Sequence, residues 1–327
     1  MHYASTHTAL LYAFSFQTSP LYQKVHDASS CCSPWGSDLS SCIDRFRKRL
    51  DCRSSRSGIC ILCLLFQRLY DSFNHSIPCC YCPDTGGHML ESSLYQMIDR
   101  RKSIRRFDGS IPLEKLDKIR SFSDIASHLI SIRSKIRIVP ASQTSCRRGE
   151  YCINYYSEES YLSLIDAGYY LEQIDLYAES IGIGVCWYGF GRTKENELDG
   201  LSFRIMLNIG EGAGLRSDRS QFNRIDSSLF WQGDGFEDVR KDVRLAPSAC
   251  NSQPWKAESH DNIIEVTRGN GKPSLLKGPY KKYFNSIDMG IFLCFLELSL
   301  SANGYAFERK LLDGSEKIAE YIARKQR

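Results

Sequence analysis

The sequence predicts an α+β protein made of two related halves that pack as a pseudo-dimer of central sheets flanked by helices. Two observations support this class. Segments with a helical apolar period alternate with short runs of β-branched and aromatic residues, and one long helix with its following strand occurs twice. The hydrophobic fraction of 42% and the charged fraction of 24% are those of a globular protein with a sizeable core.

The repeated unit is a helix that starts near an acidic residue and stops at a glycine sixteen positions later. It runs from Asp166 to Gly182 and again from Asp288 to Gly304. The apolar positions that match inside it are Leu171 with Leu293, Ile174 with Leu296 and Leu176 with Leu298. Chance similarity between two apolar stripes is the alternative. We interpret the match as an internal duplication, because two such halves can pack like the subunits of a dimer.

In the first half, a helix is expected from Ser92 or Ser93 to about Arg101. Ser110 is then expected to cap a second helix, with Pro112 in its first turn. A long core helix follows at about 160–180. The strands expected in this half are 135–139, 151–156, 185–188, which continues into a Gly-rich loop at 189–191, and 203–209.

In the second half, residues 210–235 form a polar, turn-rich crossover without a clear apolar period. Helices are expected at 236–245 and 287–303, the second of which is the repeated one. The strands expected here are 263–267 and 305–310, and the last strand is expected to be short.

The first 88 residues differ from the rest in composition. They hold nine of the fourteen cysteines and no glutamate, and they show no sustained apolar period. We therefore divide the chain into residues 1–88, a first half at 89–215, a crossover at 216–234 and a second half at 235–327. Residues 1–88 are expected to lie outside the functional domain, as an appendage or as sequence upstream of a start at Met89.

Two Cys-x-x-Cys pairs in this first segment have a spacing that a zinc site could use. They are formed by Cys60 with Cys63 and by Cys79 with Cys82. However, the first pair lies inside an apolar run without the glycine that a zinc knuckle needs for its tight turn. No metal site is therefore predicted.

The composition disfavours two classes of partner. The net charge of +4 is small for 327 residues, and the short basic patches match no nucleic-acid motif. The longest apolar runs, 59–66 and 291–300, are shorter than a membrane span, and the N-terminus lacks the features of a secretory signal. We expect a cytoplasmic protein with neither a nucleic acid nor a membrane as partner.

Residues 246–255 read Ala-Pro-Ser-Ala-Cys-Asn-Ser-Gln-Pro-Trp, and their two prolines interrupt the helical pattern before them. Ser248, Asn251 and Gln253 offer neutral donors and acceptors, and Trp255 offers a flat apolar surface. Such a loop suits a planar ligand with polar edges. An ordinary connection between a helix and a strand is the alternative.

Residues 100–106 carry five cationic side chains at the end of the first predicted helix. A favourable interaction with the helix dipole is one explanation. Cations this close repel one another unless an anion lies among them, so the cluster also predicts a phosphate site. The cluster occurs only in the first half and the loop at 246–255 only in the second. Together they would form a single site.

These motifs resemble those of the nitroreductase family, whose members bind FMN at a dimer interface. Residues 101–105 (Arg-Lys-Ser-Ile-Arg) are similar to its Arg-Arg-Ser-x-Arg element, and residues 246–255 to its Ala-Pro-Ser-x-x-Asn-x-Gln-Pro-Trp element. The order of the motifs resembles most the internally duplicated, single-chain branch, whose Gly-Leu-Gly-Thr-Cys-Trp-x-Gly stretch is similar to residues 181–189. The resemblance covers about residues 90–310 and implies a nitroreductase-like fold.

The resemblance also implies roles for individual residues. Those that would hold the FMN phosphate and ribityl chain are Arg101, Lys102, Ser103 and Arg105, with Arg224 reaching the phosphate. Those that would reach the flavin from the opposite half are Pro247, Ser248 and Asn251, with Gln253 and Trp255 shaping the loop. The backbone around Tyr188 and Gly189 would lie near the reactive N5 edge of the flavin.

The activity implied is that of an FMN-dependent NAD(P)H oxidoreductase. NADH or NADPH would supply a hydride, and a nitro-aromatic, a quinone or a similar small molecule would accept it through the flavin. The alternatives are a flavin-binding or cofactor-free module that keeps the fold without catalysis, and an enzyme of flavin destruction or dehalogenation. No general acid or base is predicted, and Cys186 and Cys250 are expected to be small packing residues. The chain is expected to act as a monomer whose halves replace two subunits.

Overall fold

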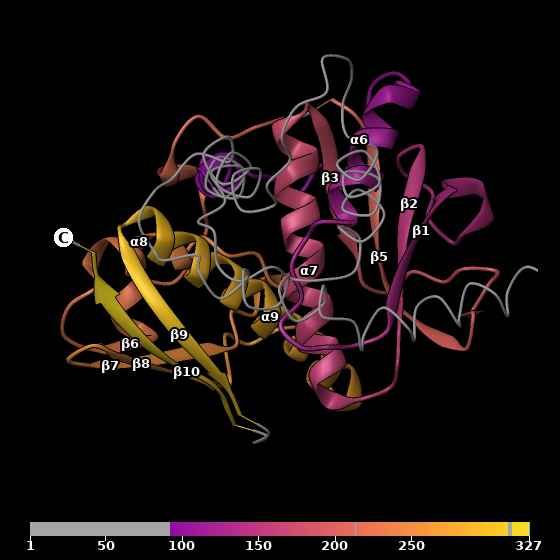
Figure 1. Cartoon of the computed structure of the whole chain (residues 1–327). Coiled ribbons are helices and arrows are strands. Elements are labelled where there is room, and N and C mark those ends of the chain that lie inside the picture. Colours follow the sequence, from indigo (N-terminus) through magenta and orange to yellow (C-terminus); the bar gives the residue numbers. More distant parts are fainter. Residues whose placement is uncertain (1–91, 213, 313–315, 327) are drawn as a thin grey trace, which may run out of the picture. The chain divides into compact units, whose positions relative to one another are not determined.

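The computed structural model describes residues 92–212, 214–312 and 316–326, all of which belong to one compact unit. The predicted boundary at residue 88 and both Cys-x-x-Cys pairs lie outside these residues. The described part consists of two separate sheets and the helices that cover them, with α7 and α9 between the sheets (Figure 1). The predicted α+β class is therefore confirmed.

The first sheet is antiparallel throughout, in the order β1-β2-β5-β3, with a two-residue strand β4 paired to β5. Its strands are β1 (Ser134–Pro140), β2 (Tyr151–Ser157), β3 (Ile183–Tyr188), β4 (Glu197–Leu198) and β5 (Leu201–Glu211). The four longer strands lie where the sequence predicts them. Because β2 and β5 are central and almost wholly buried, their apolar runs are nearly continuous.

Two helices cover the first half, α6 (Leu113–Ser123) and α7 (Tyr161–Ser180). Ser160 caps α7 in a reciprocal capping box with Ser163, as its position before the apolar stripe indicates. The prediction for α6 is wrong in its start. Pro112 is itself the residue before the helix, with φ −59° and ψ 137°, so Ser110 caps nothing. The first expected helix is helical over 92–95 and continues as turns to residue 100.

The second sheet has the order β6-β7-β8-β10-β9, with β6 parallel to β7 and the other pairs antiparallel. Its strands are β6 (Trp231–Gly233), β7 (Trp255–His260), β8 (Ile263–Arg268), β9 (Tyr305–Leu311) and β10 (Lys317–Lys325). Strands β6, β7 and β10 are not among the strands predicted from the sequence. In β7 only Trp255 is a large apolar residue, since Ala257 and Ser259 fill the other inward positions. The strand expected at 305–310 is β9, which has seven residues, and the nine-residue β10 follows it.

The helices of the second half are α8 (Glu237–Val243) and α9 (Gly278–Ala302). Helix α9 starts nine residues before its predicted start at Ile287, because a polar first turn with a proline precedes its apolar part. By length and composition α9 could cross a membrane, but 94% of its apolar window is buried within the described chain, as in a core helix. Short 3-10 helices complete the fold at Ala141–Gln143, Arg219–Gln221, Ser227–Leu229 and Ala249–Asn251.

Helices α7 and α9 cross at two glycines whose environments mirror each other. A Cβ atom on Gly168 of α7 would lie 1.9 Å from the carbonyl oxygen of Ile287, and one on Gly290 of α9 would lie 1.8 Å from the carbonyl oxygen of Ile165. These are corresponding positions of the repeated unit. The contact is therefore reciprocal, as it is across a twofold axis. An origin by duplication stays a prediction.

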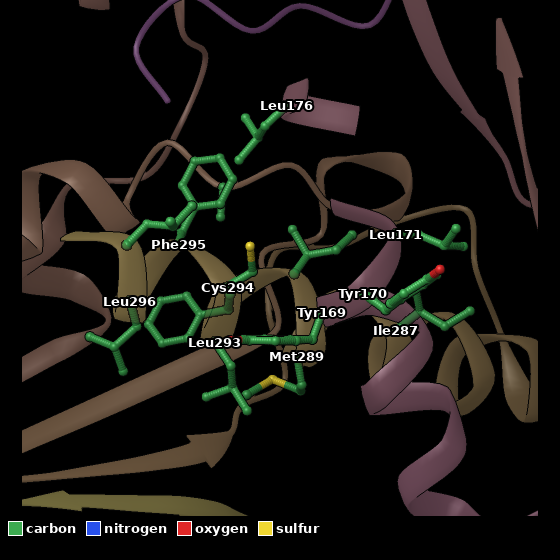
Figure 2. Close-up of a cluster of buried hydrophobic side chains, with 14 of the residues drawn as sticks. Tyr169, Tyr170, Leu171, Leu176, Ile287, Met289, Leu293, Cys294, Phe295 and Leu296 are labelled. Carbon is green, nitrogen blue, oxygen red and sulfur yellow. The ribbon is translucent and has the colours of Figure 1, made fainter. Parts of the chain in front are cut away.

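The core of the molecule is built around this crossing. Figure 2 shows side chains of α7 such as Tyr169 and Leu171 beside those of α9 such as Ile287 and Leu293. The backbones can approach so closely only because neither glycine carries a side chain. One continuous apolar cluster therefore joins the two halves.

Candidate functional site

The loop at 246–255 is anchored to α9 by one buried carboxylate. Asp288 accepts a hydrogen bond from the Ala249 amide through Oδ1 over 2.8 Å, and one from the Ser252 hydroxyl through Oδ2 over 3.3 Å. Burial raises the pKa of Asp288 to about 7, against the opposing effect of these two bonds. The loop is thus fixed to the helix that crosses into the first half.

The loop is also held by its own polar groups. Ser248 Oγ accepts from the Gln253 amide over 2.9 Å, and the buried Gln253 Oε1 accepts from the Ile225 amide over 3.0 Å. Cys250, Asn251 and Gln253 all have positive φ, between 50° and 55°, a conformation that is costly without such support. Pro247, within the loop, is buried. The loop is therefore a rigid element with a fixed outer face.

Arg224 contacts the loop from the crossover segment. Its Nε donates to the Ala246 carbonyl over 2.9 Å, and its Nη1 donates to Asn251 Oδ1 over 2.8 Å. Every acceptor of this guanidinium, including the Asn223 carbonyl, is neutral. Burial, together with the charges of Arg101 and Arg216, lowers the pKa of Arg224 to about 10.

Arg216 connects the surroundings of Arg224 to the cationic segment at residues 100–106 of the first half. It donates through its side chain to the Arg101 carbonyl and through its amide to the Arg100 carbonyl. Its guanidinium lies 4.1 Å from the centre of the Phe222 ring, and that of Arg224 lies 5.7 Å from it. Burial and the charge of Arg101 lower the pKa of Arg216.

Arg216 and Arg224 therefore form a pair of partly buried cations around one aromatic ring. Among the residues that the structure describes, no carboxylate lies within ion-pair distance of either guanidinium. Two unneutralised guanidiniums suit an anion with several oxygens, because each presents a planar set of donors. The donor set fits the phosphate of a nucleotide such as FMN, and Asn251 and Ser248 lie on the adjoining loop.

Arg101 has a different place from the one that the sequence indicates. It is 2% exposed and donates to Asp175 Oδ2 from Nε and Nη2 over 3.1 and 2.7 Å, with Glu172 at 3.4 Å. Burial lowers the pKa of Arg101, but Asp175, Glu172 and Glu179 outweigh it and raise the value. The guanidinium is therefore neutralised by α7 and does not face an open surface.

The carboxyls around Arg101 are a feature that the sequence analysis misses. Glu172, Asp175 and Glu179 lie on one face of α7, and Glu179 also accepts from the Lys102 amide. Burial raises the pKa of all three, that of Glu179 to about 9, because one guanidinium cannot neutralise three buried carboxyls. Their spacing of three and four residues inside a buried helix was the signal that could have revealed them.

The rest of the cationic segment lies at the edge of the first sheet. Ser103 forms a bridge with Val185, and the Ile104 amide donates to the Val185 carbonyl over 2.8 Å. Lys102 and Arg105 are exposed and Ser103 is half-buried. The open hollow that they border, of about 520 Å³, also takes in Ile104, Arg106, Asp108, Gly212 and Gly214. These cations remain available to an anion.

Tyr188 is the last residue of β3, and Gly189 follows it on the side of the second half. A Cβ atom on Gly189 would lie 2.8 Å from the Phe284 ring of α9. Because glycine has no side chain, the Phe284 ring of the second half can pack close to the backbone that follows β3. Tyr188 is half-buried. Nearby, Phe190 packs on Phe284 with ring centres 5.1 Å apart.

The structure thus brings the loop at 246–253, Arg224, Arg216 and the backbone of Arg101 into one connected site. The partner that sequence reasoning misses is Arg216. Of the two cysteines expected to pack, Cys186 is buried, whereas Cys250 is exposed, so that expectation is wrong for Cys250. No group of three or more His, Cys, Asp or Glu that could hold a metal occurs in the described part.

The fold is thus α+β, and a rigid polar loop of the second half lies beside arginines that have no carboxylate partner among the described residues. The family comparison is more specific. Residues 93–300, more than half of the chain, match the family described as "Putative TM nitroreductase". The chain belongs to this nitroreductase family, as its motifs predict, and its fold is nitroreductase-like.

Two solved structures are also similar to the chain. A nitroreductase from Thermotoga maritima MSB8, which its description calls putative, is 20% identical over 70% of this chain and 93% of its own, with a TM-score of 0.49. A nitroreductase family protein from Clostridium novyi NT is 20% identical over 37% of this chain and 86% of its own, with a TM-score of 0.30. The comparison with curated proteins found no match.

Proposed function

We propose that the protein is an FMN-dependent NAD(P)H oxidoreductase whose final acceptor is a nitro-aromatic, a quinone or a similar small molecule. The observation that carries this proposal is the pair Arg216 and Arg224. Both guanidiniums are partly buried, lack a carboxylate among the described residues and lie beside the loop that contains Asn251. Family membership supports an oxidoreductase, and the donor set supports a phosphate-bearing cofactor.

In this proposal Arg216 and Arg224 bind the phosphate, and the exposed cations Lys102 and Arg105 extend the positive surface. The residues proposed to contact the ribityl chain and ring are Ser103, Pro247, Ser248 and Asn251, with the backbone of Tyr188 and Gly189 near the reacting edge. Gln253 shapes the loop through its bond to the crossover. Arg101 positions the segment through α7, because its guanidinium already contacts Asp175.

The bound flavin would supply the hydride chemistry, so the chain need only bind and orient the reactants. Cys186 is no candidate nucleophile, since burial raises the pKa of its thiol. Asp288 and Ser248 hold the loop in one conformation, which keeps its outer groups oriented toward the ligand. We further propose that the protein is cytoplasmic and acts as a monomer whose two halves replace two subunits.

The test is reconstitution of the purified full chain with FMN, followed by anaerobic addition of NADH or NADPH. We expect a bound yellow flavin whose absorbance bleaches with either donor and returns when a quinone or nitro-aromatic is added. Binding without bleaching would favour the non-catalytic flavin module, and failure to bind FMN would favour the cofactor-free one. Either result would refute the proposed activity.

A further inference from the structure

A second group of polar residues lies between α6 and β1, away from the loop at 246–255. His128 Nδ1 lies 2.7 Å from Oδ2 of Asp166, a fully buried residue of α7. Asp166 also accepts from the Leu129 amide over 2.7 Å and from the Tyr155 hydroxyl over 3.0 Å. Burial and the charge of Asp166 raise the pKa of Tyr155, which keeps that hydroxyl a donor.

The contacts of His128 fit one tautomer of its neutral ring. With Nδ1 donating to the Asp166 carboxylate, Nε2 of the neutral imidazole is an acceptor. Nε2 lies 3.3 Å from the hydroxyl oxygen of Ser134, the first residue of β1. The imidazole also stacks on Tyr170, with ring centres 4.3 Å apart and planes 7° apart. The ring is therefore oriented with its basic nitrogen toward a hydroxyl.

The position of Ser134 leaves it accessible. It is only partly buried, and β1 is an edge strand of the first sheet. The Glu158 amide donates to the Arg133 carbonyl, so the next pair in the register, Ser134 with Ser157, is a non-hydrogen-bonded pair. The Ser134 amide therefore points away from β2, toward the open edge, where it can donate to an incoming oxygen.

The group is the first-half counterpart of the loop anchor. Asp166 accepts from the Leu129 amide as Asp288 accepts from the Ala249 amide, and both acids precede the crossing glycines by two positions. His128 stands where Ser248 stands in the second half, one position before the anchored amide. The group of His128, Ser134 and Asp166 shares no residue with the proposed flavin site. It can therefore carry out a different reaction.

We propose that Ser134, His128 and Asp166 form a nucleophilic triad that cleaves small, unhindered esters. Ser134 Oγ attacks the carbonyl carbon while its proton passes to His128 Nε2, and Asp166 stabilises the imidazolium that forms. The proton on Nε2 then passes to the departing alkoxide as the C–O bond breaks. Water, activated by the same nitrogen, cleaves the acyl-serine and restores the hydroxyl.

The test uses a fluorophosphonate probe and 4-nitrophenyl acetate on the full chain. The probe should form a bond from phosphorus to Ser134 Oγ with loss of fluoride, found by peptide mass spectrometry, and the ester should be cleaved with turnover. Ser134→Ala should abolish both reactions. His128→Ala should slow labelling about 100-fold, the usual contribution of a general base. Ser131→Ala, which changes an exposed serine nearby, should leave both rates unchanged.

His128→Asn separates chemistry from folding, because its amide can still donate to Asp166 but offers no base near Ser134. It should melt close to the wild-type temperature and label as slowly as His128→Ala. An unlabelled Ser134 in the wild type, or wild-type labelling in His128→Asn, would overturn the proposal. FMN binding, measured on the same samples, should not change in any of these variants, so the outcome is independent of the proposed oxidoreductase activity.

Discussion

Arg224 donates from Nη1 to Asn251 Oδ1 over 2.8 Å, and this bond joins the crossover segment to the loop of the second half. The acceptor here is a neutral amide, and burial together with the charges of Arg101 and Arg216 lowers the pKa of Arg224 to about 10. The same guanidinium shares the Phe222 ring with Arg216, which donates to the Arg101 carbonyl. One short series of contacts thus runs from the cationic segment to the loop.

Replacing Asn251 by Asp tests whether the missing counter-charge matters. The carboxylate would neutralise Arg224, but it cannot donate to the Asn223 carbonyl as Asn251 Nδ2 does over 2.9 Å. Because this loss offsets the new ion pair, we expect the free energy of unfolding without ligand to change by less than about 1 kcal/mol. FMN affinity should fall about tenfold, which is about 1.4 kcal/mol. Urea unfolding and fluorescence titration measure the two effects. Asn223→Asp adds the same charge on an exposed neighbour and should leave FMN affinity nearly unchanged; an equal fall in affinity in both variants would contradict the assignment.

Replacing Arg101 by Ala should destabilise the fold. It leaves Glu172, Asp175 and Glu179 buried without their cation, which costs about 3–5 kcal/mol at pH 8. The loss should be smaller at pH 5, where the carboxyls, whose pKa values are raised, are more fully protonated. Urea unfolding at both pH values checks this. A variant as stable as the wild type at pH 8 would show that Arg101 is not the required partner of these acids.

Substituting Ala for Gly168 or Gly290 should push α7 and α9 apart. Each new methyl group would lie within 2 Å of a backbone carbonyl oxygen of the other helix, and backbone cannot rotate away as a side chain can. We expect each variant to lose about 3 kcal/mol of unfolding free energy. Gly304→Asn is the control, since no atom lies within 4 Å of its Cβ and asparagine tolerates its φ of +71°. Similar losses in all three would argue against a tight crossing.

Asp288 should make stability depend on pH. Its pKa in the folded protein, about 7, is above the unfolded value of about 3.9. The stability that this group contributes is therefore fully present below about pH 3.9 and is lost as the pH rises to about 7. We expect Asp288→Asn to gain about 2–3 kcal/mol relative to the wild type between pH 5 and pH 8. Urea unfolding at these pH values measures it, and a difference independent of pH would exclude the raised pKa.

Much of the fold follows from local patterns. The alternation of 134–140 and the apolar stripe of α7 predict their elements, because each buries one face against a single neighbour. Strands β6 and β10 are not predicted, because their strand partners identify them. Strand β6 has three residues and pairs with β7, and β10 mixes charged and apolar residues between β8 and β9. The structure of these strands depends on their position in the sheet, which a short stretch of sequence does not reveal.

For the site, the motifs predict that the loop and a cation from the first half meet, but they do not identify which arginine stays unneutralised. Arg101 lies in the motif, yet three carboxyls from α7 surround it. Arg216 lies in a stretch without periodicity, and only the folded chain shows that it shares Phe222 with Arg224. Whether an arginine is neutralised depends on contacts between residues more than seventy positions apart, such as Arg101 and Asp175. The spacing of residues in the sequence does not show which of these contacts form.

The measurement that tests the central claim most directly compares the affinities for FMN and riboflavin, which differ only in the phosphate. In the wild type we expect FMN to bind about 100-fold more tightly, or about 2.7 kcal/mol. In the Arg216→Ala, Arg224→Ala double variant this difference should shrink to a fewfold while riboflavin affinity hardly changes. If both flavins lose affinity equally, or if the variant keeps the full preference for FMN, these two arginines do not bind the phosphate and the proposed site is wrong.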